Sequence, residues 1–234
     1  MREKFDVPRR PGRPSHPIGR DRLLRIALDA FARLGYGATS LGTVAERSGL
    51  RRASLYHHFA TKEAMYQAVL DEVVSDLRKL VLAARLQSGR FEERLDRLGE
   101  LVTEYLGRQP SAARLLLREL VEGRHYLFGA GRQHVRLAFD LIEAFLDAGM
   151  REGAFRRQDT RQLAMSIVGL HLFYFAASDL LRGLAGGADP FSPEQIASRK
   201  RALRAQVRAL CLPAAASTRT DRSRPARKIA QPTR

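Results

Sequence analysis

Residues 40–59 read SLGTVAERSGLRRASLYHHF, and this stretch decides the fold of the first part of the chain. It predicts two short helices, about Ser40 to Ser48 and about Arg51 to His58. Helices that cross steeply need a small residue at their contact, which is Ala45, and a turn residue that tolerates positive φ, which is Gly49. Three apolar residues are spaced to fill the wedge between the helices: Val44, Leu50 and Leu55. The same pattern also fits an ordinary amphipathic helix pair.

Two neighbouring residues favour contact with an anion. Lys62 falls in the first turn of a predicted long helix, where a cation opposes the helix dipole at a cost of some tenths of a kcal/mol. A DNA phosphate held by free backbone N–H groups would offset that cost. Gly42 weakens its helix by up to about 1 kcal/mol but would let the backbone approach DNA closely. Solvation of Lys62 and simple helix packing at Gly42 are the alternatives.

The first 70 residues resemble the TetR (tetracycline-repressor-like) family of bacterial regulators. The resemblance covers about residues 21–70 and rests on these matches: Gly35-Tyr36, Thr39-Ser40, Val44-Ala45, Ser48-Gly49-Leu50, Leu55-Tyr56, His58-Phe59 and Lys62-Glu63. Beyond residue 70 the chain matches only in length and helical character. The resemblance implies an N-terminal helix-turn-helix that binds DNA and a divergent helical domain behind it.

The resemblance also implies particular DNA contacts. One set of side chains would contact phosphates: Thr39, Thr43, Tyr56 and Lys62. A second set would face base edges in the major groove: Arg51, Arg52, Ser54 and His57. His58 and Phe59 are expected to close the core of the small domain. Arg51 departs from the family, which more often has a small hydroxyl residue there to cap the recognition helix, so the start of that helix stays open.

Positive charge is concentrated at the two ends of the chain. Of the net +16, residues 1–20 carry +4, residues 21–62 carry +4 and residues 213–234 carry +5, which leaves +3 for the 150 residues between. Such clustering favours a polyanion, either nucleic acid or an anionic membrane surface. An Arg-rich composition throughout is the alternative, but acidic residues nearly balance Arg in the middle.

The two basic ends are expected to lack regular structure. Residues 1–19 are proline-rich and read as a flexible arm, and residues 213–234 read as a disordered tail. The arm contains Arg9-Arg10-Pro11-Gly12-Arg13-Pro14, which resembles an AT-hook, although the full motif has Arg where Pro11 stands. Arg10 and Arg13 are the expected minor-groove contacts. Non-specific phosphate attraction for the arm and a solubilising role for the tail are the alternatives.

Helical periodicity continues through the rest of the chain, and no strand pattern appears. We expect an all-α fold of about nine helices, with the N-terminal helix-turn-helix domain at residues 20–66 and a helical-bundle domain for dimerisation and ligand sensing at 67–212. Besides the two short helices, the expected ones are about 21–34, 62–86, 91–107, one from Pro110, 132–149, 160–184 and 193–210.

The second domain is expected to form a homodimer and a sensing pocket. The apolar helix 160–184 and the last helix 193–210 are the interface candidates, although Ile167, Leu170 and Phe173 also suit a monomer core. A pocket between helix 62–86 and later helices would bind an unidentified effector, apolar or aromatic. Its candidate lining residues are Tyr105, Phe128, His134, Phe139, His171 and Tyr174.

Other classes of protein find little support in the sequence. There is no Gly-x-Ser-x-Gly, no phosphate-binding glycine loop with Lys and no His-Glu-x-x-His, so catalysis is not expected. The single cysteine, Cys211, excludes an intramolecular disulfide, and no residue cluster suggests a metal or cofactor. Residues 162–178 lack charge but are shorter than the roughly 20 residues of a membrane span. The N-terminus does not read as a secretory signal.

The sequence therefore predicts a bacterial, cytoplasmic, nucleoid-associated regulator. It would bind a palindromic operator as a dimer and respond to a ligand as a repressor, repression being only the habit of the family. A non-specific DNA-coating protein and an interfacial membrane protein are the competing hypotheses.

Overall fold

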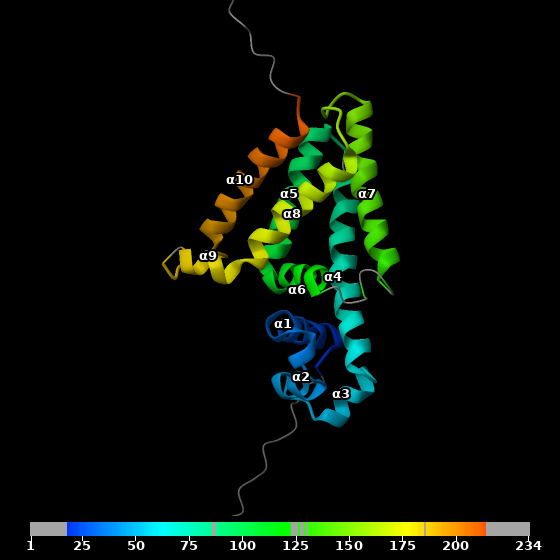
Figure 1. Ribbon diagram of the computed structural model, residues 1–234, viewed down its shortest axis with the longest axis vertical. Coiled ribbons are helices and arrows are strands. Elements are labelled where there is room, and N and C mark those ends of the chain that lie inside the picture. The colour runs from blue at the N-terminus through cyan, green and yellow to red at the C-terminus, as the bar shows by residue number, and fades with distance from the viewer. Residues whose placement is uncertain are drawn as a thin grey trace, which may run out of the picture.

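The computed structural model describes residues 18–85, 88–122, 126, 129, 131–184 and 186–213. Within these ranges the chain forms ten α-helices and no strand, which confirms the all-α fold class and adds one helix to the expected nine. We call residues 18–66 the head and the described residues from 67 onward the body. Figure 1 shows the head at one end of an elongated molecule and the body above it.

The head consists of α1 (Arg20–Ala38), α2 (Leu41–Ser48), α3 (Arg52–His58) and the first turns of α4 (Lys62–Arg85). The first helix was expected to end at about residue 34, but it continues to Ala38 with a break at Gly35. Gly35 has φ 79° and ψ 168°, and one further helical turn follows before Thr39. The long helix α4 then runs from the head into the body (Figure 1) and joins the two parts.

The body is a bundle of six helices packed on the upper part of α4. In chain order they are α5 (Phe91–Arg108), α6 (Pro110–Glu122), α7 (Arg132–Arg151), α8 (Thr160–Ala176), α9 (Ser178–Leu184) and α10 (Pro193–Cys211). The helix α6 crosses the bundle at its lower end and packs against both α1 and α8, whereas α10 packs against α5 and α8. The body therefore meets the head mainly through α6 and α4.

The expected single helix 160–184 is wrong, because the chain bends by 65° between α8 and α9. Arg114 of α6 donates hydrogen bonds to Ser178 (2.5 Å) and to Asp179 (2.9 Å), and these contacts hold the start of α9 against α6. The bend also bears on a membrane span. No single helix in the described ranges is long and apolar enough to cross a membrane, and only the bent pair α8 and α9 reaches that length and composition together.

The apolar core is divided into two clusters of buried side chains. The first runs without interruption from the head into the body and includes Leu23, Phe31, Leu55, Leu70, Leu106, Leu115 and Phe175. The second fills the far end of the body around Phe145, Phe155, Leu163 and Val207. Because the first cluster crosses the head–body boundary, a displacement of α6 or α4 is transmitted to side chains of the head.

Ion pairs attach α10 to the outer side of α5. Lys200 contacts Glu104 at 2.6 Å, Arg208 contacts Asp96 at 2.6 Å, and Arg204 contacts Glu100. These pairs are partly exposed, so each contributes little to stability alone. Together they hold α10 beside α8, and these are the two helices from which the sequence predicts a dimer interface.

Candidate nucleic-acid interface

The turn between α2 and α3 has the geometry that the sequence predicts. Gly49 adopts the left-handed conformation (φ 69°, ψ 14°), and the Leu50 N–H donates to the Ala45 carbonyl at 2.9 Å. Ala45 is buried where the two helices touch, and Val44 and Leu55 are fully buried beneath it. A side chain at residue 49 would strain this turn. The helix pair is therefore a rigid unit built on the head core.

The helix α3 presents most of its polar side chains to solvent. Arg51 precedes the helix in an extended conformation and its side chain does not cap it, so the helix begins at Arg52. Arg51, Arg52 and His57 are exposed, and Ser54 is half-buried. The expectation for His58 is wrong, because it is exposed. Phe59 is buried as expected, with the Arg20 guanidinium 4.7 Å from its ring centroid.

An open hollow of about 480 Å³ lies beside α3 in the head. Its walls are residues 37–42, Arg52, Tyr56 and residues 60–62. Two helices begin at this hollow. Ser40 accepts a hydrogen bond from the Thr43 N–H (3.0 Å) at the start of α2, and Thr61 caps α4 by accepting from the Ala64 N–H (3.0 Å). Two helix N-termini and two cationic side chains thus surround one concave surface, an arrangement that favours an anion.

Lys62 is held in this hollow by protein contacts. Its ammonium group donates to the carbonyls of Tyr36 (2.7 Å) and Gly37 (3.4 Å) and lies 4.1 Å from the centroid of the Tyr36 ring. The end of α1 therefore already supplies acceptors for the Lys62 ammonium group without an external anion. An ammonium group has three N–H donors, so one remains for the hollow.

The two threonines of the predicted phosphate set differ in their surroundings. The Thr39 hydroxyl is 1% exposed and donates to the Gly35 carbonyl at 2.7 Å, so it secures the break in α1. Its assignment as a phosphate contact through the side chain is corrected on that ground. The Thr43 hydroxyl is half-buried at the start of α2, 2.9 Å from the Ser40 hydroxyl.

Gly42 makes room for Arg52. A Cβ atom at residue 42 would lie 2.4 Å from a terminal nitrogen of the Arg52 guanidinium, which rests on the backbone of α2. Arg52 and Tyr56, one helical turn apart, therefore face the hollow together. Sequence reasoning grouped Arg52 with the base-reading residues, and it had no means of detecting this contact between two helices.

The arm contacts Arg10 and Arg13 lie outside the described residues, as do Phe128 and the tail beyond Pro213. The other five residues of the predicted effector pocket lie on α5, α7 and α8, and their role in binding an effector stays a prediction. Tyr105 and Tyr174 belong to or pack on the first core cluster, and Phe139 packs on the second. His134 is exposed on α7, 2.8 Å from Asp71. His171 is buried in α8, where burial lowers its pKa and keeps it neutral.

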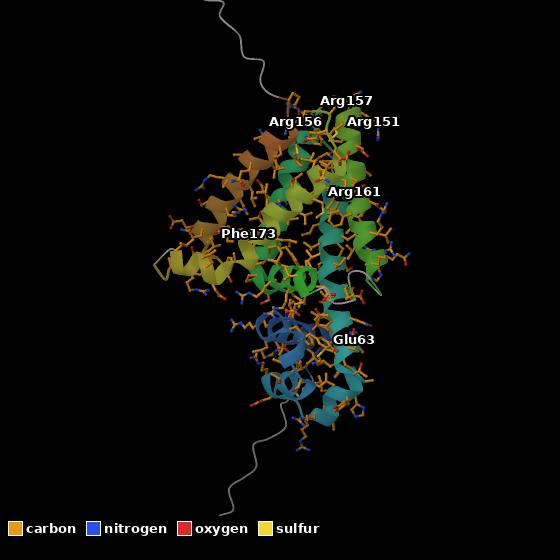
Figure 2. All side chains as sticks on the ribbon, viewed as in Figure 1. Glu63, Arg151, Arg156, Arg157, Arg161 and Phe173 are labelled. Atoms are coloured by element: carbon orange, nitrogen blue, oxygen red, sulfur yellow. The ribbon has the colours of Figure 1, made fainter. Side chains whose placement is uncertain are left out.

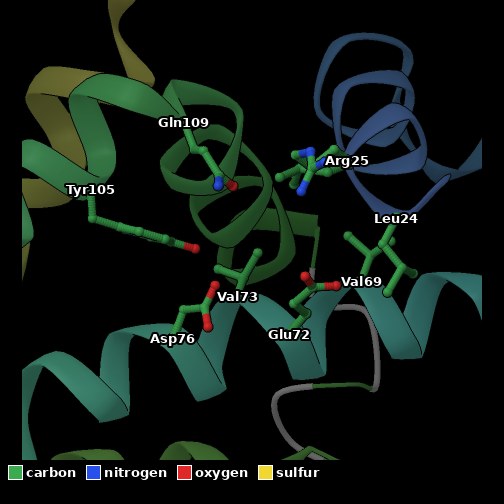
Figure 3. Close-up of a pocket in the computed structure, with 9 residues that line it drawn as sticks. Leu24, Arg25, Val69, Glu72, Val73, Asp76, Tyr105 and Gln109 are labelled. Atoms are coloured by element: carbon green, nitrogen blue, oxygen red, sulfur yellow. The ribbon is translucent and has the colours of Figure 1, made fainter. Parts of the chain in front are cut away.

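Tyr105 lines a small polar cavity where the head meets the body (Figure 3). The cavity has a volume of about 10 Å³, is walled by α1, α4 and α5, and includes Arg25, Glu72 and Asp76. The Tyr105 hydroxyl and the Glu72 Oε2 atom are both buried there without a hydrogen-bond partner. Burial, and then the charges of Asp76 and Glu72, raise the pKa of Tyr105. These buried polar groups therefore lower the stability of the contact between the head and the body.

Glu72→Gln is expected to raise the melting temperature of the protein at neutral pH. Burial raises the pKa of Glu72, as do the charges of Asp76 and Asp21, while Arg25 and Lys79 lower it. Because the pKa of Glu72 is higher in the folded than in the unfolded state, its protonation stabilises the folded state at low pH. This stabilisation is lost as pH rises through the folded-state pKa. The gain from Gln should therefore shrink as pH falls toward about 4.3, the ordinary pKa of glutamic acid. Thermal unfolding at several pH values measures it. The exposed Glu46→Gln is the control, and a pH-independent gain would contradict the account.

The Cys211 thiol is expected to resist Ellman's reagent at pH 7.5 until the chain is unfolded. Burial raises its pKa to about 11, so the reactive thiolate is scarce. Arg156 secures this end of α10 by donating its backbone N–H to the Cys211 carbonyl (2.8 Å) and its Nε to the Leu210 carbonyl (2.7 Å). Titration with and without denaturant should give zero and one reactive thiol per chain. Rapid reaction of the folded chain would show that α10 frays.

A second surface with functional potential lies between α8 and α10. An open groove of about 570 Å³ is lined by Ser166, Gly169, Leu170, Phe173, Arg199, Gln206 and Leu210. Phe173 of α8 is 63% exposed (Figure 2). Met165 of the same helix is 52% exposed. Arg199 supports the groove by donating to the Leu170 carbonyl (2.6 Å) and stacking on Tyr174. Exposed apolar surface of this kind marks an interface.

Comparison with known proteins identifies relatives for both parts of the chain. Residues 23–69 match the family model of bacterial regulatory proteins of the tetR family, and residues 92–207 match the tetracyclin repressor-like C-terminal domain. The transcriptional repressor KstR2 of Mycolicibacterium smegmatis is 38% identical over 86 residues, which cover 30% of this chain and 42% of the relative. The regulator RutR of Escherichia coli is 26% identical over 145 residues, covering 62% and 68%. The chain spans about half the length of the first of these curated relatives.

Solved structures share the whole fold at low sequence identity. The ketosteroid transcriptional regulator KstR2 of Mycobacterium tuberculosis superposes with a TM-score of 0.67 at 21% identity, covering 83% of this chain and 95% of that one. The fatty acid degradation regulator FadR of Bacillus halodurans gives a TM-score of 0.62 at 18% identity, covering 79% and 97%. Because the two family models together match well over half of its residues, in the head and in the body alike, this chain belongs to the TetR family of bacterial regulatory proteins.

Proposed function

We propose that this chain is a ligand-responsive transcriptional repressor that binds a palindromic operator as a homodimer. The observation that carries the proposal is the cationic hollow of the head beside an exposed recognition helix. Membership of a family of regulatory proteins supports DNA binding and leaves the enzyme alternative without support. Such a regulator would act in the bacterial cytoplasm, at the nucleoid.

The hollow suits a DNA phosphate. The first N–H groups of α2 and of α4 have no partner inside their helices, and a phosphate oxygen accepts readily from such groups. Arg52 and Lys62 add positive charge at the same place, and the Tyr56 hydroxyl lies on the same wall. We assign Tyr56 and Lys62 to the phosphate in the hollow, as the family resemblance implies, and add Arg52 because it lines the same hollow. Thr43, which the resemblance also assigns to phosphate, contacts Ser40 at the edge of this hollow.

Base recognition then falls to the exposed side of α3 and to the residue before it. His57 lies on the side of α3 away from buried Leu55, and Arg51 is free of any capping role. An Arg that pairs with a guanine edge, or a His that donates a hydrogen bond to one, favours the correct base pair over a wrong one by about 1–3 kcal/mol of binding free energy. Ser54 is half-buried and contributes at the margin of this surface.

The dimer forms through α8 and α10, with a two-fold axis that sets the two heads at the spacing of two half-sites. Around such an axis the same patch of each protomer meets its copy. The exposed Phe173 of one protomer would enter the groove between α8 and α10 of its partner. Half-sites then lie about one helical turn apart, or a multiple of it.

An apolar or aromatic effector would bind within the body and lower operator affinity. KstR2 of Mycobacterium tuberculosis is a ketosteroid regulator and FadR is a fatty acid degradation regulator, which supports an apolar small molecule for this relative of theirs. KstR2 of Mycolicibacterium smegmatis is a repressor, which supports repression. The change in operator affinity cannot exceed the difference in effector affinity between the two states.

Selection of bound sites from a random duplex library at near-physiological salt tests the proposal. The full chain is compared with a chain that lacks residues 1–19 and 213–234. A two-fold symmetric motif recovered with both chains would support a dimeric, sequence-specific regulator. Binding without a motif, lost when the basic ends are removed, would mean that the chain coats DNA through charge. Flotation with anionic vesicles distinguishes the membrane hypothesis.

A further inference from the structure

Tyr66 joins the two parts of the molecule through opposite ends of one side chain. Its ring is buried in the head core, 4.9 Å from the ring centroids of both Phe31 and Tyr36 in edge contacts. Its hydroxyl donates a hydrogen bond of 2.6 Å to Oε2 of Glu119 on α6 of the body. A movement of α6 that shifts Glu119 therefore acts directly on a ring packed against the end of α1.

Glu119 is suited to fix the position of α6. It is fully buried, and besides the Tyr66 hydroxyl its other oxygen accepts from the Tyr126 backbone N–H at 3.0 Å. A buried carboxylate is costly to leave without its donors. Glu119 thus couples three segments: α4, α6 and the connection that follows α6.

The chain of contacts that begins at Glu119 and Tyr66 continues to the hollow. Tyr36, which receives the edge of the Tyr66 ring, also carries the carbonyl that accepts from Lys62 at 2.7 Å, and its ring lies 4.1 Å below the same ammonium group. The position of Tyr36 therefore sets the position of Lys62. Since Lys62 is a wall of the cationic hollow, the geometry of the hollow depends on a buried carboxylate in another part of the molecule.

A second contact supports the same chain of contacts one residue away on α6. Arg118, paired with Glu122 at 2.8 Å, occupies the space beside Gly35, where a Cβ atom would lie 2.4 Å from its guanidinium. Gly35 is the break in α1, and its carbonyl accepts from the Thr39 hydroxyl just before α2. The helix α6 therefore contacts both the residue that bends the end of α1 and the ring stack that supports Lys62.

We propose that Glu119 and Tyr66 are positioning residues, which hold Lys62 in the geometry that binds phosphate. This inference deepens the proposed function and rests on it for the role of Lys62 in DNA binding. The coupling itself is a property of the folded chain and exists without DNA.

The first test uses Tyr66→Phe and Glu119→Gln in the full chain, with a duplex recovered by the selection experiment as the probe. Affinity is measured over a range of KCl concentrations. Each variant should bind about three- to tenfold more weakly, which is the net effect of losing one hydrogen bond of ordinary strength. The salt slope should fall by up to about 1, as in Lys62→Ala, because one phosphate contact is lost. Adding Tyr66→Phe to Lys62→Ala should weaken binding no further.

Thr103→Val is the control. It removes a buried hydroxyl from the body, where Thr103 on α5 donates to the Gly99 carbonyl of the same helix at 2.7 Å. It should leave affinity and salt slope unchanged. A lower melting temperature for Tyr66→Phe with an unchanged salt slope would assign Tyr66 to stability alone and overturn the proposal. Tyr66→Phe decides the matter even where Glu119→Gln fails to fold.

The second test needs no DNA, so it stands even where the selection recovers no duplex. Amide hydrogen exchange is compared between the native chain and the same variants over residues 36–43 and 62–66. Exchange should be at least about threefold faster there in Tyr66→Phe and Glu119→Gln, since local opening reports local stability. Thr103→Val should leave these segments unchanged. Unchanged exchange in all variants would overturn the coupling, whereas faster exchange without any DNA binding would sustain it and reject the proposed function.

Discussion

Phe173→Asp is expected to convert a dimer into a monomer at micromolar concentration. The side chain is 63% exposed beside an apolar groove, so in the dimer it would occupy the centre of the interface. Central aromatic residues contribute about 2–4 kcal/mol to association, and a carboxylate buried in their place adds a desolvation cost. The dimer dissociation constant should therefore rise by about 30-fold to 1,000-fold. Sedimentation velocity over a concentration series measures it.

Loss of the dimer should also weaken binding to a two-fold symmetric duplex, because each head then binds its half-site alone. Affinity for a single half-site should stay unchanged, since Phe173 lies in the body. Leu137→Asp is the control: it places the same charge on an exposed apolar residue of α7 and should leave the protein dimeric. A Phe173→Asp protein that remains a dimer would move the interface away from α8 and α10.

The parts of the fold that were predictable from the sequence depend on local interactions. Gly49 between two short helical patterns favours a turn of positive φ, which the backbone adopts, and Thr61 caps the helix that follows it directly. The buried positions Val44 and Leu55 follow from helical spacing. Residues that are close together in the chain are therefore enough to predict most of the helices and the turn of the head.

The features that were missed are set by contacts between distant residues. No glycine or proline marks the bend after Ala176, where Arg114 of another helix donates hydrogen bonds to Ser178 and Asp179. The carbonyl partners of Lys62 lie 26 and 25 residues away, and Arg52 rests on a different helix at Gly42. The effector pocket stays a prediction, because the aromatic and histidine composition on which it rests carries no information on which helix faces meet.

Arg52→Ala is expected to weaken binding to all duplexes alike. The guanidinium lies in the hollow with Tyr56 and Lys62, so it would neutralise a phosphate. Affinity should fall severalfold for selected and scrambled duplexes together, and the salt slope should fall by about 1. Binding titrations at four salt concentrations on both duplexes measure the effect.

His57→Ala provides the opposite result on the same helix. Its side chain is exposed outside the hollow, so its loss should cost about 1–3 kcal/mol of discrimination at particular base pairs, about 5-fold to 150-fold, with little change on scrambled DNA. Repeating the site selection with each variant separates the two roles, since only the His57 variant should change the recovered motif. If Arg52→Ala changes the recovered motif instead, the result would mean that the Arg52 guanidinium of the native chain leaves Gly42 when DNA binds and reaches a base edge. Gly42→Ala would then have little effect on affinity, because the space that Gly42 provides would be used only in the free protein.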